Sequence, residues 1–88
     1  MTTNDFICEN FEVFTAIADD IDLEITETQV VPINLVNTLS VKYIKKYPQH
    51  PKAMIINTVI RAANEHNANI YQDNARCAVM DATNVLVM

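Results

Sequence analysis

The 88-residue chain contains no glycine, although average usage of ~7% would give about six in a protein of this length. Glycine supplies positive backbone φ angles and close approach of the backbone to a ligand at little steric cost. Phosphate-binding loops, dinucleotide fingerprints and the nucleophile elbow of hydrolases all depend on it. The sequence therefore excludes those enzyme classes and favours helices joined by turns of proline and asparagine.

Cysteines and long apolar runs are also scarce. Cys8 and Cys77 are far apart and match no metal or redox spacing. No stretch approaches the ~20 apolar residues that a transmembrane helix needs. Met1 precedes the polar run 2–5, without the basic segment of a secretory signal. These features predict a cytoplasmic protein with reduced thiols.

Catalytic and metal-binding residues are not expected. A nucleophile and base could come only from Cys8 or Cys77 with His50 or His66, and no spacing indicates the oriented third group that activation requires. Zinc ligands usually occur in closely spaced pairs, which the chain lacks. We therefore predict a non-enzymatic protein without a metal or cofactor.

Charge is distributed unevenly along the chain. Residues 1–41 contain eight acidic residues and no lysine or arginine, whereas residues 42–88 contain all six basic residues and only three acids. The two parts carry net charges of −8 and +3, which give −5 overall. Such asymmetry is typical of proteins that recognise a charged partner.

Apolar spacing predicts an all-α fold of three or four helices in a single domain spanning residues 1–88. A first helix is expected over residues 5–20, capped by Thr3 or Asn4. Its predicted inner stripe is Ile7, Phe11, Phe14, Ala18 and Ile21. Residues 21–27 alternate apolar and polar side chains as a strand does. With no second clear strand to pair with, an extended connector is favoured there.

Proline positions predict a central antiparallel helical hairpin over residues 33–65. Pro32 suits the start of one helix and Pro51 the start of the next, and the short connection that follows Tyr47 joins them. The expected inner residues are Val36, Leu39, Tyr43 and Tyr47 on the first helix, and Met54, Ile55, Thr58, Val59, Ala62 and Ala63 on the second. Asn67 is predicted to cap the second helix, and Asn69 to begin a fourth.

Half of the residues are hydrophobic, which is high for a chain too short to bury a large core. A second copy or another partner is therefore expected to cover part of the apolar surface. The C-terminal residues Val85, Leu86 and Met88 are predicted to form the contact of a homodimer.

The acidic half predicts recognition of a protein with a basic surface. The residues assigned to this face are Glu9, Glu12, Asp19, Asp20, Asp22 and Glu24. A regulator or inhibitor is the favoured function, of the general kind that phages and mobile elements direct against host defence or nucleic-acid enzymes. Two simpler interpretations are a solvated helix face and ion pairs with the chain's own basic half across a dimer.

Two alternative functions use other features. A dimeric nucleic-acid-binding transcriptional regulator would contact phosphates through Lys42, Lys45, Lys46 and Arg61, with Tyr43 or Tyr47 stacking on bases. A structural assembly subunit would use the apolar surface alone. The net charge of −5 and the expected inward direction of the tyrosines disfavour nucleic acid.

Overall fold

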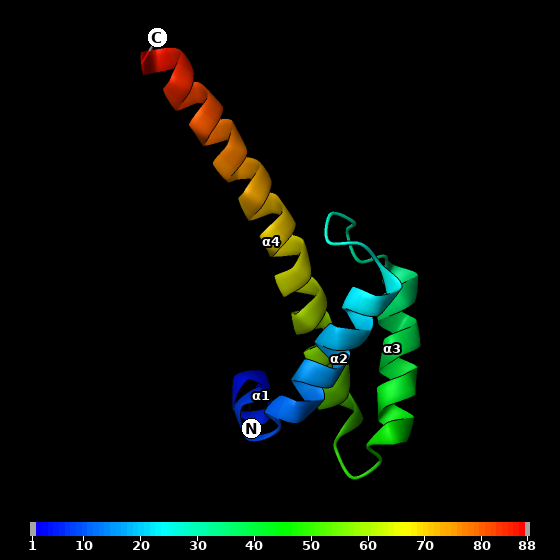
Figure 1. Ribbon diagram of the computed structural model, residues 1–88. Coiled ribbons are helices and arrows are strands. Elements are labelled where there is room, and N and C mark those ends of the chain that lie inside the picture. Colours follow the sequence, from blue (N-terminus) through cyan, green and yellow to red (C-terminus); the bar gives the residue numbers. More distant parts are fainter. Residues whose placement is uncertain (1, 88) are drawn as a thin grey trace.

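The computed structural model describes the backbone of residues 2–87 and the side chains of residues 2–70. Its elements are α1 (Thr3–Glu9), α2 (Phe11–Glu24), α3 (Ile33–Lys46) and α4 (Lys52–Val87), with no strand in the described backbone (Figure 1). The predicted all-α class is confirmed. Residues 21–27 form neither a strand nor an extended connector over their whole length. Helix α2 continues to Glu24, and extended backbone begins only at Ile25.

Helix α1 begins at Thr3, two residues earlier than expected. Thr2 is its cap: the Asp5 amide donates to the Thr2 hydroxyl oxygen at 3.1 Å, and the Thr2 amide donates to the Asp5 carboxylate at 3.4 Å. This reciprocal pair satisfies two backbone donors that the first turn of a helix leaves without partners.

The predicted helix over residues 5–20 is broken at Asn10. The backbone amide and the side-chain amide of Asn10 both donate to the Phe6 carbonyl oxygen, at 2.9 and 3.1 Å. These bonds end α1 and turn the chain into α2. The break changes which side chains face inward, so the predicted stripe was wrong in part. Phe11 is 61% exposed, and the buried positions are Phe6, Val13, Ile17 and Ile21.

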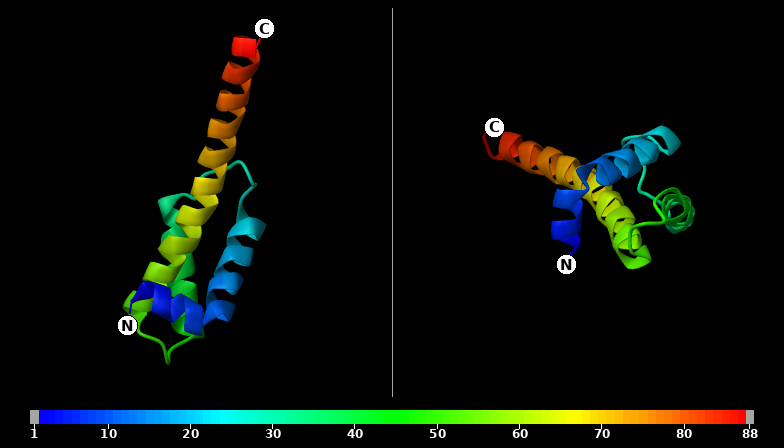
Figure 2. Two further views of the ribbon diagram at one scale, coloured as in Figure 1. Left: turned by 90° about the vertical axis from the view of Figure 1, so that its left-hand side faces the viewer. Right: turned by 90° about the horizontal axis from the view of Figure 1, so that it is seen from below.

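The hairpin of α3 and the first half of α4 is confirmed. Pro32 precedes α3, Tyr47 follows its last residue, and Pro51 precedes α4. Of the predicted inner residues, Leu39, Tyr43, Ile55, Thr58, Val59, Ala62 and Ala63 are buried. Helix α2 and helix α3 both pack against α4, which places the core among these three helices (Figure 2).

The predicted cap at Asn67 and the new helix at Asn69 were wrong, because α4 runs without interruption through both positions. No residue has positive φ in the part of the chain that the structure describes. The Asn67 side-chain oxygen instead accepts the Val31 backbone amide at 2.9 Å, 36 residues away in sequence. The Asn67 side chain therefore makes a tertiary contact instead of ending a helix. The proposed dimer contacts Val85, Leu86 and Met88 lie outside the residues whose side chains are described.

Among the helices described, none is long and apolar enough to cross a membrane.

Candidate functional site

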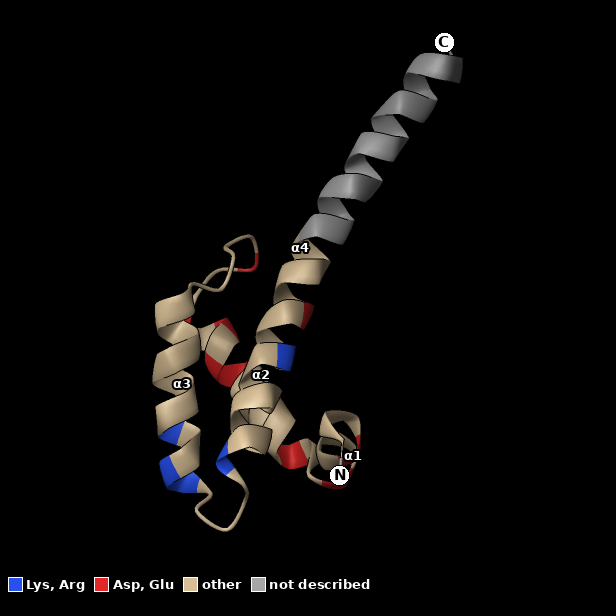
Figure 3. Ribbon diagram, turned by 180° about the vertical axis from the view of Figure 1, so that it is seen from behind, with Lys and Arg blue, Asp and Glu red and all other residues tan. Residues whose placement is uncertain are grey.

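The acidic residues predicted as a recognition face do not form one continuous stripe. Glu9 ends α1, whereas Glu12 and Asp19 lie two turns apart on α2 and so share a helix face. Asp22 and Glu24 follow in the last turn of α2. All five are exposed, and they define the acidic surface of α1 and α2 (Figure 3).

Asp20, the sixth predicted residue, is engaged within the protein. Its carboxylate lies 2.8 Å from the Lys42 ammonium of α3 and accepts a hydrogen bond from the Tyr43 hydroxyl. That hydroxyl also lies 3.0 Å from the Ala16 carbonyl oxygen. Asp20 therefore joins α2 to α3, and the pairing of acidic and basic halves that the sequence suggested across a dimer occurs here inside one chain.

The contacts of Asp20 change the acidity of both partners. The hydrogen bonds from Lys42 and Tyr43 hold the pKa of Asp20 below its usual 3.8, since both favour the charged carboxylate. Burial and the bond to Asp20 raise the pKa of the Tyr43 hydroxyl, because both disfavour a phenolate. The cluster holds α2 against α3, and the acidic surface therefore consists of the five other acids.

Three acids of the acidic surface lie where they oppose the helix dipole. Glu9 is in the last turn of α1, and Asp22 and Glu24 are in the last turn of α2, and neither turn contains a basic residue. A helix C-terminus carries partial negative charge, so each carboxylate there destabilises the helix by about 0.3–1 kcal/mol. His66 Nδ1 lies 3.8 Å from the Asp22 carboxylate, and it compensates that charge only when the imidazole is protonated. The placement of these acids does not serve helix stability.

Of the four basic residues of the alternative site, Lys42, Lys45 and Lys46 lie in the last two turns of α3, whereas Arg61 lies on α4. Lys42 is paired with Asp20, and Lys46 lies over the rings of Tyr43 and Tyr47 at 5.5 and 5.6 Å. Arg61 donates to the Asn4 side chain of α1.

The two tyrosines proposed to stack on bases instead pack within the protein. Tyr43 is buried, and its ring stacks on that of half-buried Tyr47 with centroids 6.1 Å apart. His50 closes this aromatic cluster, 5.9 Å from Tyr47 and 5.1 Å from Phe6. Tyr43 is therefore closed to a base, and Tyr47 is only partly exposed, unlike the open stacking platforms of single-strand binders.

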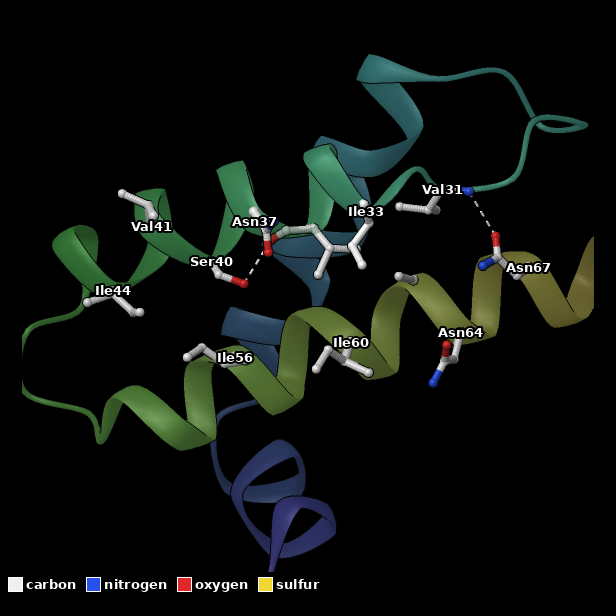
Figure 4. Close-up of a pocket in the computed structure, with 12 residues that line it drawn as sticks. Val31, Ile33, Asn37, Ser40, Val41, Ile44, Ile56, Ile60, Asn64 and Asn67 are labelled. Carbon is white, nitrogen blue, oxygen red and sulfur yellow. Dashed lines mark hydrogen bonds between the residues drawn. The ribbon is translucent and has the colours of Figure 1, made fainter.

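A groove between α3 and α4 is the main feature that sequence reasoning missed. It has a volume of about 630 Å³ and opens on the side of the hairpin that no other described helix covers (Figure 4). Exposed aliphatic side chains border it, among them Ile33 at 75% and Val41 at 53% exposure. The described residues that line it are Val31, Ile33, Val36, Asn37, Ser40, Val41, Ile44, Ile56, Ile60, Ala63, Asn64 and Asn67.

Polar groups in the groove are few and uncharged. The Ser40 hydroxyl donates to the Val36 carbonyl oxygen at 2.8 Å, and Asn67 is occupied by the Val31 amide. Asn37 and Asn64 are exposed and add amide groups at the rim.

A signal for the groove was present in the sequence. Ile56 and Ile60 are one turn apart and lie outside the apolar face predicted for residues 54–63, so they form a second apolar stripe on the same helix. A helix with two apolar stripes has more than one packing surface.

Comparison with known proteins assigns no family to this chain. No protein-family model matches it, and neither a curated protein sequence nor a solved structure does.

Proposed function

We propose that this protein acts by binding a protein with a basic surface, through the acidic surface formed by Glu9, Glu12, Asp19, Asp22 and Glu24. One observation carries the proposal: Glu9, Asp22 and Glu24 are exposed at helix C-termini, where a carboxylate opposes the dipole. Substitutions that remove such charges raise stability, so a role in recognition is a physical reason to retain them.

The exposed acids suit steering of a partner. The ion pairs of residues 2–70 do not involve Glu9, Glu12 or Asp19, so their field extends into solvent. A surface of one sign accelerates encounter with an opposite surface and contributes less to the lifetime of the complex. A regulator or inhibitor that covers the working surface of a basic target would use the acids in this way.

Charge reversal tests the proposal. We would capture partners from a native lysate, identify them by mass spectrometry, and measure association rates with the wild type and with the triple variant Glu9→Lys, Glu12→Lys, Asp19→Lys. Association should slow at least about tenfold in the variant at low salt, and the difference should shrink at high salt.

A matched control variant and two contrary outcomes complete the test. The triple variant Glu9→Gln, Glu12→Gln, Asp19→Gln keeps similar side-chain shapes and should give an intermediate rate. Equal rates for wild type and charge-reversed protein at low salt would mean that the acids are only a solvated face. Tight, salt-sensitive binding of a DNA duplex by the wild type would instead favour the nucleic-acid alternative.

A further inference from the structure

Phe11 is a large aromatic side chain left uncovered beside two carboxylates. The break at Asn10 places it at the start of α2, with Glu9 ending α1 just before it and Glu12 directly after it. All three side chains are exposed, and the exposed fraction of Phe11 is 61%. The corner between α1 and α2 therefore presents an aromatic ring that two negative charges flank along the chain.

The ring of Phe11 is held in place by a second ring. It stacks on Phe14, one turn further along α2, with the centroids 5.9 Å apart and the planes inclined by 24°. Phe14 is half-buried and packs against the core. Because the stack restricts the Phe11 side chain beforehand, a partner that covers the ring pays less for ordering it.

Among the described side chains, no cation of the protein itself lies over the Phe11 ring. The lysines that lie over aromatic rings do so at Tyr43 and Tyr47. Arg61, which contacts α1, donates to Asn4 near the beginning of that helix rather than to Glu9 at its end. This corner is therefore accessible to a cation from another molecule.

The ring and the two carboxylates together determine which chemistry suits this corner. An apolar group over Phe11 would remove water from Glu9 and Glu12 without giving them partners, which is costly. A guanidinium satisfies all three groups, because its plane stacks on an aromatic face while its N–H groups pair with carboxylates. A lysine ammonium is more strongly hydrated and has no plane to stack. We propose that Phe11, Glu9 and Glu12 bind an arginine side chain of the basic partner, an inference that rests on the proposed function.

The acids and the ring should act on different steps of binding. Exposed charges accelerate the encounter, whereas a side chain covered in the complex slows its dissociation. Phe11→Leu keeps an apolar side chain and removes the aromatic face, so it separates stacking from simple burial, and Phe11→Tyr retains a ring. Leu23→Ala is the matched control, since Leu23 is 83% exposed near the opposite end of the same helix.

Fluorescence anisotropy with labelled hexa-arginine and hexa-lysine peptides tests the site at low salt. The wild type, Phe11→Tyr and Leu23→Ala should bind hexa-arginine about two- to fivefold more tightly than hexa-lysine, as a cation–aromatic contact at an exposed site predicts. Phe11→Leu should bind both peptides but lose most of this preference, and circular dichroism should show that the variants are folded. Equal binding of the two peptides by the wild type overturns the arginine site, and so does a full preference in Phe11→Leu.

The captured partner separates this inference from the proposed function. Phe11→Leu should raise the dissociation rate of that complex at least about threefold and leave its association rate near that of the wild type. If charge reversal of the acids slows association while Phe11→Leu leaves dissociation unchanged, the arginine site is wrong and the proposed function stands. Unchanged association of the charge-reversed variant at low salt overturns the proposed function and the arginine site with it.

Discussion

Asp20, Lys42 and Tyr43 form the one polar cluster in which the charged halves of this sequence meet within the described side chains. The Tyr43 ring is buried, while its hydroxyl reaches the Asp20 carboxylate across the α2–α3 contact. Hydrogen bonds to a charged group stabilise a protein more than neutral ones do. The cluster therefore fixes the position of α2 on α3 as well as contributing to stability.

Tyr43→Phe should lower the free energy of unfolding by about 1–3 kcal/mol, because it removes the hydroxyl and leaves the Asp20 carboxylate with one fewer donor. Urea denaturation followed by circular dichroism measures this change. Tyr47→Phe is the matched control and should alter stability much less. A double-mutant cycle of Tyr43→Phe with Asp20→Asn should show clear coupling, and additive effects would contradict the assignment.

Acid should weaken this cluster. Because the folded-state pKa of Asp20 lies below its usual 3.8, the folded state favours the charged carboxylate. Its contribution is fully present above about pH 5 and is lost as the pH falls through 3.8 toward the folded-state value. Wild type and Asp20→Asn should therefore differ in stability at neutral pH and converge on acidification. Curves that stay parallel down to the acid limit would show that Asp20 is not the responsible group.

Helix α2 illustrates a conflict between local stability and surface charge. Its first turn contains Glu12, which suits the positive end of the dipole, and its last turn contains Asp22 and Glu24, which do not. An isolated helix with this pattern would be disfavoured at its end. Packing of Val13, Ile17 and Ile21 into the core, each nearly inaccessible to solvent, outweighs the charge effect.

Glu24→Lys should raise the free energy of unfolding by about 0.3–1 kcal/mol at low salt, since a cation at a helix C-terminus is favourable. The same substitution at the other end, Glu12→Lys, should lower it by a similar amount. Thermal unfolding at low and high ionic strength measures both, and salt should reduce the two effects together. A stability change of the same sign in both variants would refute the dipole explanation.

The whole molecule depends on α4 as the helix against which the others pack. Val59 lies on the face of α4 that enters the shared core and is fully inaccessible to solvent. The folded state of a domain this small is favoured by only a few kcal/mol. One disruptive change at this position is therefore comparable to the entire stability of the protein.

Val59→Asp should unfold the protein, because an unpaired carboxylate would be buried where helices α2, α3 and α4 meet. Far-ultraviolet circular dichroism should show loss of most helical signal at room temperature. Asn57→Asp introduces the same side chain at an exposed position two residues away and should leave the spectrum unchanged. A folded Val59→Asp variant would mean that this core is wrong.

Local sequence patterns predicted helix ends and inner positions correctly where one physical signal dominated. Proline fixed both ends of the α3–α4 connection, and apolar spacing of 3.6 residues identified Leu39, Tyr43, Ile55 and Val59 as inner positions. Local patterns failed where one type of side chain can form two different kinds of hydrogen bond. Asparagine can end a helix or bond elsewhere: Asn10 ends α1, whereas Asn67 stays inside α4 and holds Val31.

The sequence alone determined the all-α class and the hairpin, because helix period and proline stereochemistry act within a few residues. It also determined the charge asymmetry and the exclusion of glycine-dependent enzyme sites. Tertiary structure decided that Asp20 turns toward Lys42 and Tyr43, over 20 residues away, while Glu12 and Asp19 face solvent. It also decided that Ile56 and Ile60 border an open groove with α3. Pairing and exposure depend on which helices lie side by side, and that arrangement is set by the packing of the whole core rather than by any local segment.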